Sequence, residues 1–164
     1  MSFTSDDPMN SELTERLARL VRERATAALG TLHAGAPFVS MVPYAIAKDG
    51  FIIHVSTLAA HTKDMLADAR VSLLIAQGEG RGASPLALMR VSVQAEAQPI
   101  SRETTEYAAH KAAYLDRFPD ADDMFEFADF SVFLLRPASA RFVAGFGEAH
   151  SLSGESITQL LGRR

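Results

Sequence analysis

The sequence lacks cysteine and tryptophan and contains no long apolar run. Without cysteine, the chain forms no disulfide, thiolate nucleophile, zinc knuckle or iron–sulfur cluster. No stretch approaches the roughly eighteen consecutive apolar residues of a membrane-spanning helix, and the polar, acidic start MSFTSDDPMNSE is unlike a secretory signal. We therefore expect a cytoplasmic protein that does not engage membranes.

Positive charge is also scarce. The formal net charge is −4 and the pI is about 5.7, so the surface offers no general attraction for phosphate backbones and nucleic acid is not an expected partner. The five histidines form no HxxxH or HExxH pair, so we expect no closed metal site. A single axial haem ligand is compatible with the same pattern.

The length and composition indicate one globular domain. A chain of 164 residues with 48% hydrophobic and 22% charged residues can bury a sizeable core. Its slightly apolar mean hydropathy of +0.04 is consistent with a subunit interface. We predict a flexible leader over residues 1–10, a domain over residues 11–150 and a polar C-terminal tail over residues 151–164 that could form a weak helix.

Periodicity and turn residues predict a small antiparallel barrel with flanking helices. Asp49-Gly50 is typical of a tight hairpin, and Pro43 must sit where no ladder hydrogen bond is needed. Turn signals recur every eight to twelve residues through the middle of the chain. The expected helices are residues 11–24, 60–67 and 101–117, and the expected strands are residues 28–33, 38–47, 51–56, 70–76, 88–99, 130–136 and 140–147.

Two polar features could be structural or functional. Between Ser56 and Lys63 the chain offers hydroxyls, an imidazole and a cation, which either end a strand and cap a helix or hold a phosphate. Arg90 opens a strand, where it either pairs with an acidic neighbour or makes a bidentate contact with a phosphate or carbonyl pair. No GxSxG nucleophile elbow is present, so a hydrolase has no support.

A succession of segments resembles a known family. GAPFVSMVPYA, DGFIIHVS, AAHTK, RVSLLIA, RVSVQAEAQPI and ARFVAGFG, in this order, are similar to the flavin-binding split barrels related to pyridoxamine 5'-phosphate oxidase, and more closely to the haem-utilisation branch. The resemblance covers about residues 25–149. It implies a mainly β, α+β fold, namely a six-stranded antiparallel split barrel with flanking helices. It also implies a homodimer that holds FMN in clefts at the subunit interface.

The resemblance also nominates cofactor-binding residues. By this resemblance, a strand along the flavin ring contributes Ser40, Met41, Val42 and Pro43, and a facing strand contributes His54, Val55 and Ser56. A phosphate-binding turn contributes His61, Thr62 and Lys63, and Arg90 makes one polar contact with the flavin. Ser40 and Ala45 stand where the oxidase itself carries an arginine and a lysine, so oxidation of pyridoxamine phosphate is not expected.

Two functions follow from this resemblance. We predict an FMN-dependent oxidoreductase acting on an unidentified small-molecule substrate or electron acceptor, with no catalytic side chain assigned. The alternative is a haem-binding or haem-utilisation protein on the same barrel, with His61 or His150 as the candidate ligand. Absorbance of the protein with added FMN or haemin distinguishes the two.

Overall fold

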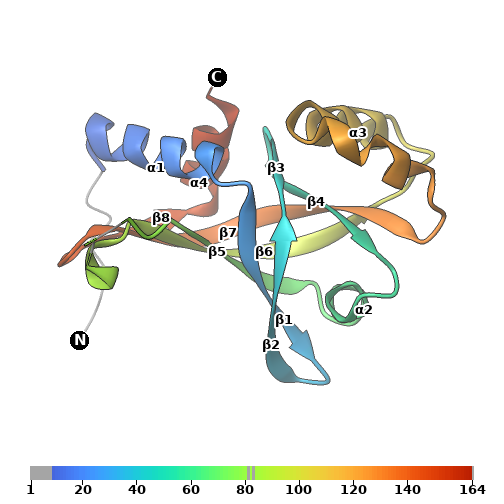
Figure 1. Cartoon of the computed structure of the whole chain (residues 1–164), viewed down its shortest axis with the longest axis horizontal. Helices are drawn as coiled ribbons and strands as arrows, with labels where there is room; N and C mark the ends of the chain where they lie inside the picture. Colours follow the sequence, from blue (N-terminus) through green and yellow to red (C-terminus); the bar gives the residue numbers. More distant parts are fainter. Residues whose placement is uncertain (1–8, 81, 83, 164) are drawn as a thin grey trace.

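The computed structural model describes residues 9–80, 82 and 84–163. Figure 1 shows a curved sheet with helices α1 and α4 at one end, α3 at the other and α2 beside the β1–β2 hairpin. The strands are β1 (Thr26–His33), β2 (Ala36–Pro43), β3 (Ala45–Ala47), β4 (Gly50–Ser56), β5 (Arg70–Ala76), β6 (Arg90–Ile100), β7 (Phe130–Gly145) and β8 (Glu148–Ser153). The helices are α1 (Ser11–Glu23), α2 (Ala60–Ala67), α3 (Thr105–Arg117) and α4 (Gly154–Gly162), with short 3₁₀ helices η1 (Pro85–Ala87) and η2 (Pro119–Glu126).

All strands join one antiparallel sheet in the order β2-β1-β5-β6-β7-β4-β3, and β8 pairs with the end of β7. Strands β2 and β3 occupy the two ends of this order, although only Tyr44 separates them in the chain. The sheet must therefore curl so that its two ends approach each other, which is the geometry of a barrel. The prediction of an α+β split barrel is confirmed.

The sheet has eight strands, whereas the resemblance predicts six. Pro43 has no amide hydrogen, so β2 ends there and β3 begins after Tyr44. The two strands predicted over residues 130–136 and 140–147 are instead one strand, β7. Pro137 of β7 lies opposite Ala95 of β6, where the pairing of the two strands shifts register between Gln94 and Ala95. This irregularity lets the strand continue through a residue without an amide hydrogen. The chain then turns at residues 146–147 and adds β8.

The predicted Asp49-Gly50 hairpin is confirmed. Strands β3 and β4 pair from Ala47 opposite Gly50 onward. A Cβ atom at position 50 would lie 2.3 Å from the carbonyl oxygen of Leu135 on β7. Glycine is therefore required here because another backbone passes close to it.

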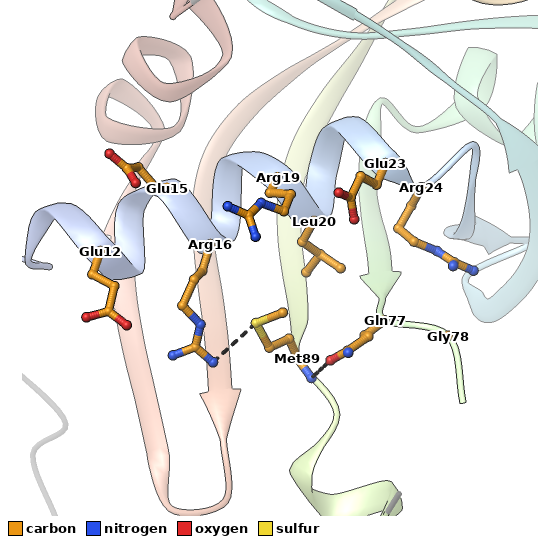
Figure 2. Close-up of a pocket in the computed structure, with 10 residues that line it drawn as sticks. All are labelled: Glu12, Glu15, Arg16, Arg19, Leu20, Glu23, Arg24, Gln77, Gly78 and Met89. Carbon is orange, nitrogen blue, oxygen red and sulfur yellow. Dashed lines mark hydrogen bonds between the residues drawn. The ribbon is translucent and has the colours of Figure 1, made fainter. Parts of the chain in front are cut away.

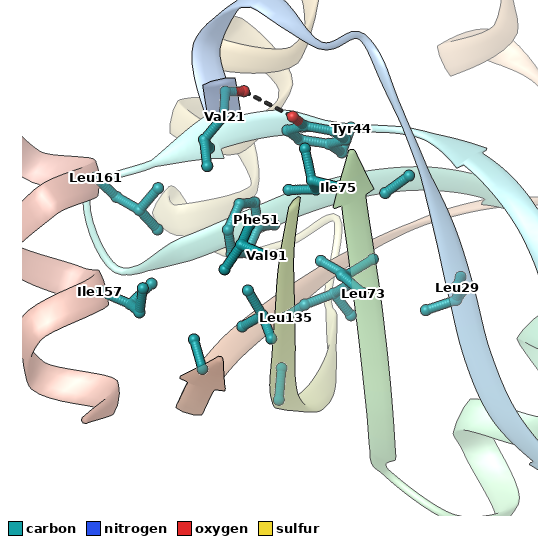
Figure 3. Close-up of a cluster of buried hydrophobic side chains, with 14 of the residues drawn as sticks. Val21, Leu29, Tyr44, Phe51, Leu73, Ile75, Val91, Leu135, Ile157 and Leu161 are labelled. Atoms are coloured by element: carbon teal, nitrogen blue, oxygen red, sulfur yellow. Dashed lines mark hydrogen bonds between the residues drawn. The ribbon is translucent and has the colours of Figure 1, made fainter. Parts of the chain in front are cut away.

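The main core fills the barrel and extends beneath α1 and α4 (Figure 3). Every second residue of β6 from Val91 to Ala97 points inward, as expected for a strand with one buried face. Tyr44 is fully buried, and its hydroxyl donates a 2.6 Å hydrogen bond to the carbonyl of Val21 at the end of α1. Burial raises the pKa of Tyr44 to about 12, although Arg117 and Arg24 act against it.

The C-terminal residues differ from the prediction. Residues 151–163, predicted as a polar tail, complete β8 and form α4. Ile157, Leu160 and Leu161 of α4 are buried in the main core, because their spacing places all three on one helix face. The compact unit thus continues past residue 150. Most of the predicted leader, residues 1–8, lies outside the described residues.

The N-terminal helix agrees with the prediction except at its cap. Ser11 is a capping residue type and opens the predicted helix, but the Asn10 side chain accepts the capping hydrogen bond, and Leu13, Leu17, Leu20 and Val21 are buried. Across the described ranges, no helix combines the length and hydropathy needed to cross a bilayer.

Candidate functional site

Helix α2 is fixed to strand β1 by a buried carboxylate. Asp64 is 4% exposed. It accepts hydrogen bonds from the Thr31 hydroxyl at 2.8 Å and from His33 Nδ1 at 2.7 Å. Burial acts to raise the pKa of Asp64, but the hydrogen bonds from His33 and Thr31 outweigh burial and lower it. Asp64 is therefore an anion at neutral pH and sets the position of α2.

A second contact joins α2 to strand β2. Ser40 Oγ lies 3.0 Å from His61 Nδ1, so this pair of predicted site residues is brought together. Burial lowers the pKa of His61, while the charge of Asp64 acts in the opposite direction. The neutral imidazole is thus favoured, and this is the form of histidine that binds metals.

The hydroxyls of the predicted phosphate-binding turn are already engaged. Thr62 is 1% exposed and donates to the carbonyl of Ser56 at 2.7 Å. The Ser56 hydroxyl donates to Asp129 Oδ2 at 3.2 Å and accepts from the amide of Leu58. A carboxylate beside Ser56 opposes the approach of a phosphate. These hydroxyls therefore serve the fold of the β4–α2 connection.

Lys63 is the member of this turn whose charged group stays available. It is exposed, and within the described ranges it forms no hydrogen bond or ion pair. Its amide and that of Thr62 bond to the carbonyl of Ala59, the residue that precedes α2. The side chain of Ala59 makes no capping hydrogen bond. The helix start thus offers one free cation and a partly engaged set of amides.

Strand β2 exposes apolar side chains. Val42 is buried, whereas Met41 and Val39 are each 66% exposed and Pro43 is also exposed. Met41 and Leu74 both lie opposite Ala28 of β1, so they share the outer side of the sheet. We call Val39, Met41 and Leu74 the outer apolar face. It offers an uncovered surface for a flat apolar ligand or another protein.

A shallow groove of about 450 Å³ lies on the same side of the sheet. Small side chains make it possible, because Gly30 of β1 and Ser72 of β5 lie opposite each other there. Its wall also includes Leu32, Pro37 and Gln94, so it runs from β2 across to β6.

The structure places the other predicted residues away from α2. His54 is 7% exposed, and its ring stacks on Phe125 of η2 at a centroid distance of 3.8 Å and an interplanar angle of 5°. Val55 is buried in the main core. Arg90 donates to the carbonyl of Leu88, and strands β1 and β5 lie between its strand and that of Ser40. Within a single chain, these three residues do not line the Ser40–His61 site.

Another cleft of about 450 Å³ lies between α1 and the ends of β5 and β6 (Figure 2). Arg16, Arg19 and Arg24 face it together with three glutamates of α1. Arg16 donates to the carbonyl of Ala144 and contacts the sulfur of Met89. The opposite charges balance, so the cleft shows no preference for an anion or a cation.

Sequence reasoning missed the residues that hold α2. Asp64 follows Lys63 directly and is one acidic residue among many in this chain. Thr31 and His33 have the spacing of residues on one face of a strand, which is a weak signal. Among the described residues, no group of three or more His, Cys, Asp or Glu could hold a metal ion.

Comparisons with known proteins agree with this fold. A family model described as pyridoxamine 5'-phosphate oxidase matches residues 13–144. Heme oxygenase HutZ of Vibrio cholerae is 26% identical over 155 residues, which cover 93% of this chain and 88% of that protein. The chloroplastic heme oxygenase HOZ of Arabidopsis thaliana is 38% identical over 124 residues, which cover 75% of this chain and 36% of that protein.

Solved structures give the same result. A heme binding protein from Mycobacterium smegmatis superimposes with a TM-score of 0.82 at 30% identity, covering 92% of this chain and 61% of that one. HutZ of Vibrio cholerae, described as a heme storage protein, superimposes with a TM-score of 0.70 at 27% identity, covering 79% of this chain and 91% of that one. The chain thus spans only part of the Mycobacterium and Arabidopsis proteins. Its matched residues and its barrel place it in the pyridoxamine 5'-phosphate oxidase family.

Proposed function

We propose that this protein binds haem on its split barrel. The main support is the similarity over almost its full length to a heme oxygenase, together with the similarity to a heme binding protein. We predicted haem as the alternative and FMN as the first choice, and the comparisons favour the alternative.

The geometry of the β4–α2 connection supports the same choice. An FMN phosphate needs free hydroxyls and amides around its cation. Here the Thr62 hydroxyl is buried and engaged, and Ser56 is bonded to the carboxylate of Asp129. Only Lys63 remains available for an anionic group, which suits a carboxylate at the edge of a porphyrin as well as a phosphate.

The residues around β2 fit haem in chemical type. A porphyrin requires an apolar surface, and Phe38, which is 37% exposed, offers one on the side of the β1–β2 hairpin that carries His33. Iron requires an imidazole or another axial donor, and His61 and His33 both lie where α2 meets the β1–β2 hairpin. When bound, haem supplies an iron centre for redox chemistry, while the protein's residues position it and control access to it.

We further propose that the protein is a homodimer. The outer apolar face and the adjoining groove are open in one chain, and a second copy related by a two-fold axis would cover both.

Haem binding is tested by adding haemin to the purified protein and recording absorbance from 300 to 700 nm. We expect a Soret band that saturates at one haem per chain. We also expect that FMN added under the same conditions keeps its free fluorescence. No Soret change at micromolar protein would overturn the proposal.

An FMN-dependent oxidoreductase remains the second candidate, because Lys63 is free beside the first turn of α2. This reading predicts yellow protein and quenched flavin fluorescence. It also predicts that Lys63→Ala weakens FMN binding, whereas Lys48→Ala, which removes an exposed lysine from the β3–β4 turn, leaves it unchanged. Equal FMN affinity in both variants would remove the role assigned to Lys63.

A further inference from the structure

His33 differs from the other histidines in how its two ring nitrogens are used. Its Nδ1 lies 2.7 Å from the buried carboxylate of Asp64, yet its side chain is 59% exposed. The Thr31 hydroxyl holds the other carboxylate oxygen at 2.8 Å. The imidazole is thus anchored on its inner side and open on its outer side.

The contacts of Asp64 determine the tautomer of His33. The Thr31 hydroxyl donates to one carboxylate oxygen and His33 Nδ1 lies 2.7 Å from the other, and a carboxylate can only accept hydrogen bonds. His33 Nδ1 must therefore carry the proton, which leaves the lone pair of a neutral ring on Nε2. Within the described residues, Nε2 forms no hydrogen bond. A histidine that donates one ring N–H to a carboxylate is the usual arrangement of a metal ligand.

The other histidines are less suited to bind an iron centre from solvent. His54 and His110 are buried beneath and within α3, and each has a buried ring nitrogen without a hydrogen-bond partner among the described residues. His150 has a buried Nε2 that lies 3.6 Å from Glu148. His61 is half-buried and uses Nδ1 in its contact with Ser40, a neutral partner.

We propose that His33 is the axial ligand of bound haem and that Asp64 is the positioning residue behind it. This inference rests on the proposed haem binding and adds the residue that holds the iron. The ring of Phe38, at a centroid distance of 5.7 Å from His33, provides an apolar wall beside the ligand. Phe38 lies opposite Thr31 on β2, so both rings belong to the side of the hairpin on which α2 is anchored.

Haemin titrations of the wild type and of His33→Ala, His61→Ala and His150→Ala test the ligand. We expect His33→Ala to bind haemin at least about tenfold more weakly and to lose the ferric absorbance and electron paramagnetic resonance signature of histidine ligation. The other two variants should keep the wild-type signature. His33 is 59% exposed, so its ring fills no space in the core, and added imidazole should restore the ligated spectrum of His33→Ala.

Asp64→Asn tests the positioning role with His33 in place. A carboxylate hydrogen bond makes the imidazole a stronger donor and favours ferric iron. We therefore expect Asp64→Asn to raise the reduction potential of bound haem and to lower the iron–histidine stretching frequency in the resonance Raman spectrum. A purely structural role would change the unfolding midpoint and leave both of these readouts unchanged.

The results separate the two proposals. If the wild type fails to bind haemin, the proposed function fails. If the wild type binds haemin and His33→Ala retains its ligation spectrum, the assignment of His33 fails while haem binding stands. An unchanged potential and stretching frequency in a folded Asp64→Asn variant would overturn the role of Asp64.

Discussion

Acid should weaken the packing of α3 and η2 on the barrel through His54. This residue of β4 is buried, stacked on Phe125 and edge-on to Tyr114 at a centroid distance of 5.8 Å. Its Nε2 has no hydrogen-bond partner among the described residues. Burial, reinforced by the positive charges of Arg102 and Lys111, lowers the pKa of His54 from 6.5 to about 4.

The sign and size of the effect follow from this shift. Since the pKa is lower in the folded state, the unfolded chain binds more protons between pH 6.5 and pH 4. The stability contributed by neutral His54 is therefore complete above pH 6.5 and is lost as the pH falls toward 4. The pKa shift of His54 sets an upper limit of about 3 kcal/mol on the stability that acid can remove. Solvent beside α3 and η2 screens part of this effect. We therefore expect the free energy of unfolding to fall by about 1–2 kcal/mol between pH 7 and pH 5.

Urea unfolding of the wild type and His54→Phe, at pH 7, 6 and 5, measures this loss. Phenylalanine keeps the stack on Phe125 and removes the titrating group. The unfolding free energy of the wild type should fall more steeply with acid than that of the variant, by about 1–2 kcal/mol at pH 5. Titration of other groups, including His61, is common to both proteins and cancels. Parallel pH profiles would show that His54 does not resist protonation.

Three further substitutions test the fold and the dimer. Gly50→Ala places a Cβ against the Leu135 carbonyl, where backbone cannot yield, and should cost more than about 2 kcal/mol in urea unfolding. Tyr44→Phe removes the buried hydrogen bond to Val21 and should cost about 1–2 kcal/mol in the same assay. Met41→Lys puts a charge on the outer apolar face and should convert the expected dimer to a monomer in sedimentation. A wild-type monomer at micromolar concentration would contradict the dimer.

Local sequence rules located most elements of the fold. Helix α2 and strand β5 occupy the predicted residues, because a segment free of proline and glycine favours a helix and a short apolar run favours a buried strand. The join of two predicted strands into β7 was missed, since Pro137 suggests a break unless the neighbouring strand is known to shift register there. The burial of α4 was missed because nine residues with three apolar positions fold as a helix only when a core is available to them.

The candidate site was predicted less completely, because sequence shows which polar groups exist but not which are already engaged. Ser40 and His61, which the resemblance assigns to a strand and to a separate turn, lie in contact. Ser56 and Thr62 have the chemistry of phosphate ligands, yet Thr62 bonds to the Ser56 carbonyl. The alternation along β4 shows that His54 lies on one face of the strand but not which face is covered. The packing of η2 shows that His54 faces Phe125.

Unused hydrogen-bonding capacity is therefore a better guide to a binding site than residue type. At the junction of α2 with the β1–β2 hairpin, the buried carboxylate of Asp64 accepts hydrogen bonds from the Thr31 hydroxyl and from His33 Nδ1. Asp64 and Thr31 therefore use their hydrogen-bonding groups within the protein. Within the part of the chain that the structure describes, His33 Nε2 and the ammonium of Lys63 have no hydrogen-bond partner, and the contacts of Asp64 and of α2 hold both groups in place. An anion with a flat apolar body and a metal at its centre uses the imidazole, the cation and the exposed ring of Phe38 together. The phosphate of FMN uses the cation but no imidazole nitrogen, and the carboxylate of Asp129 beside Ser56 acts against it. We therefore propose haem rather than FMN on these contacts together with the similarity to a heme oxygenase and a heme binding protein.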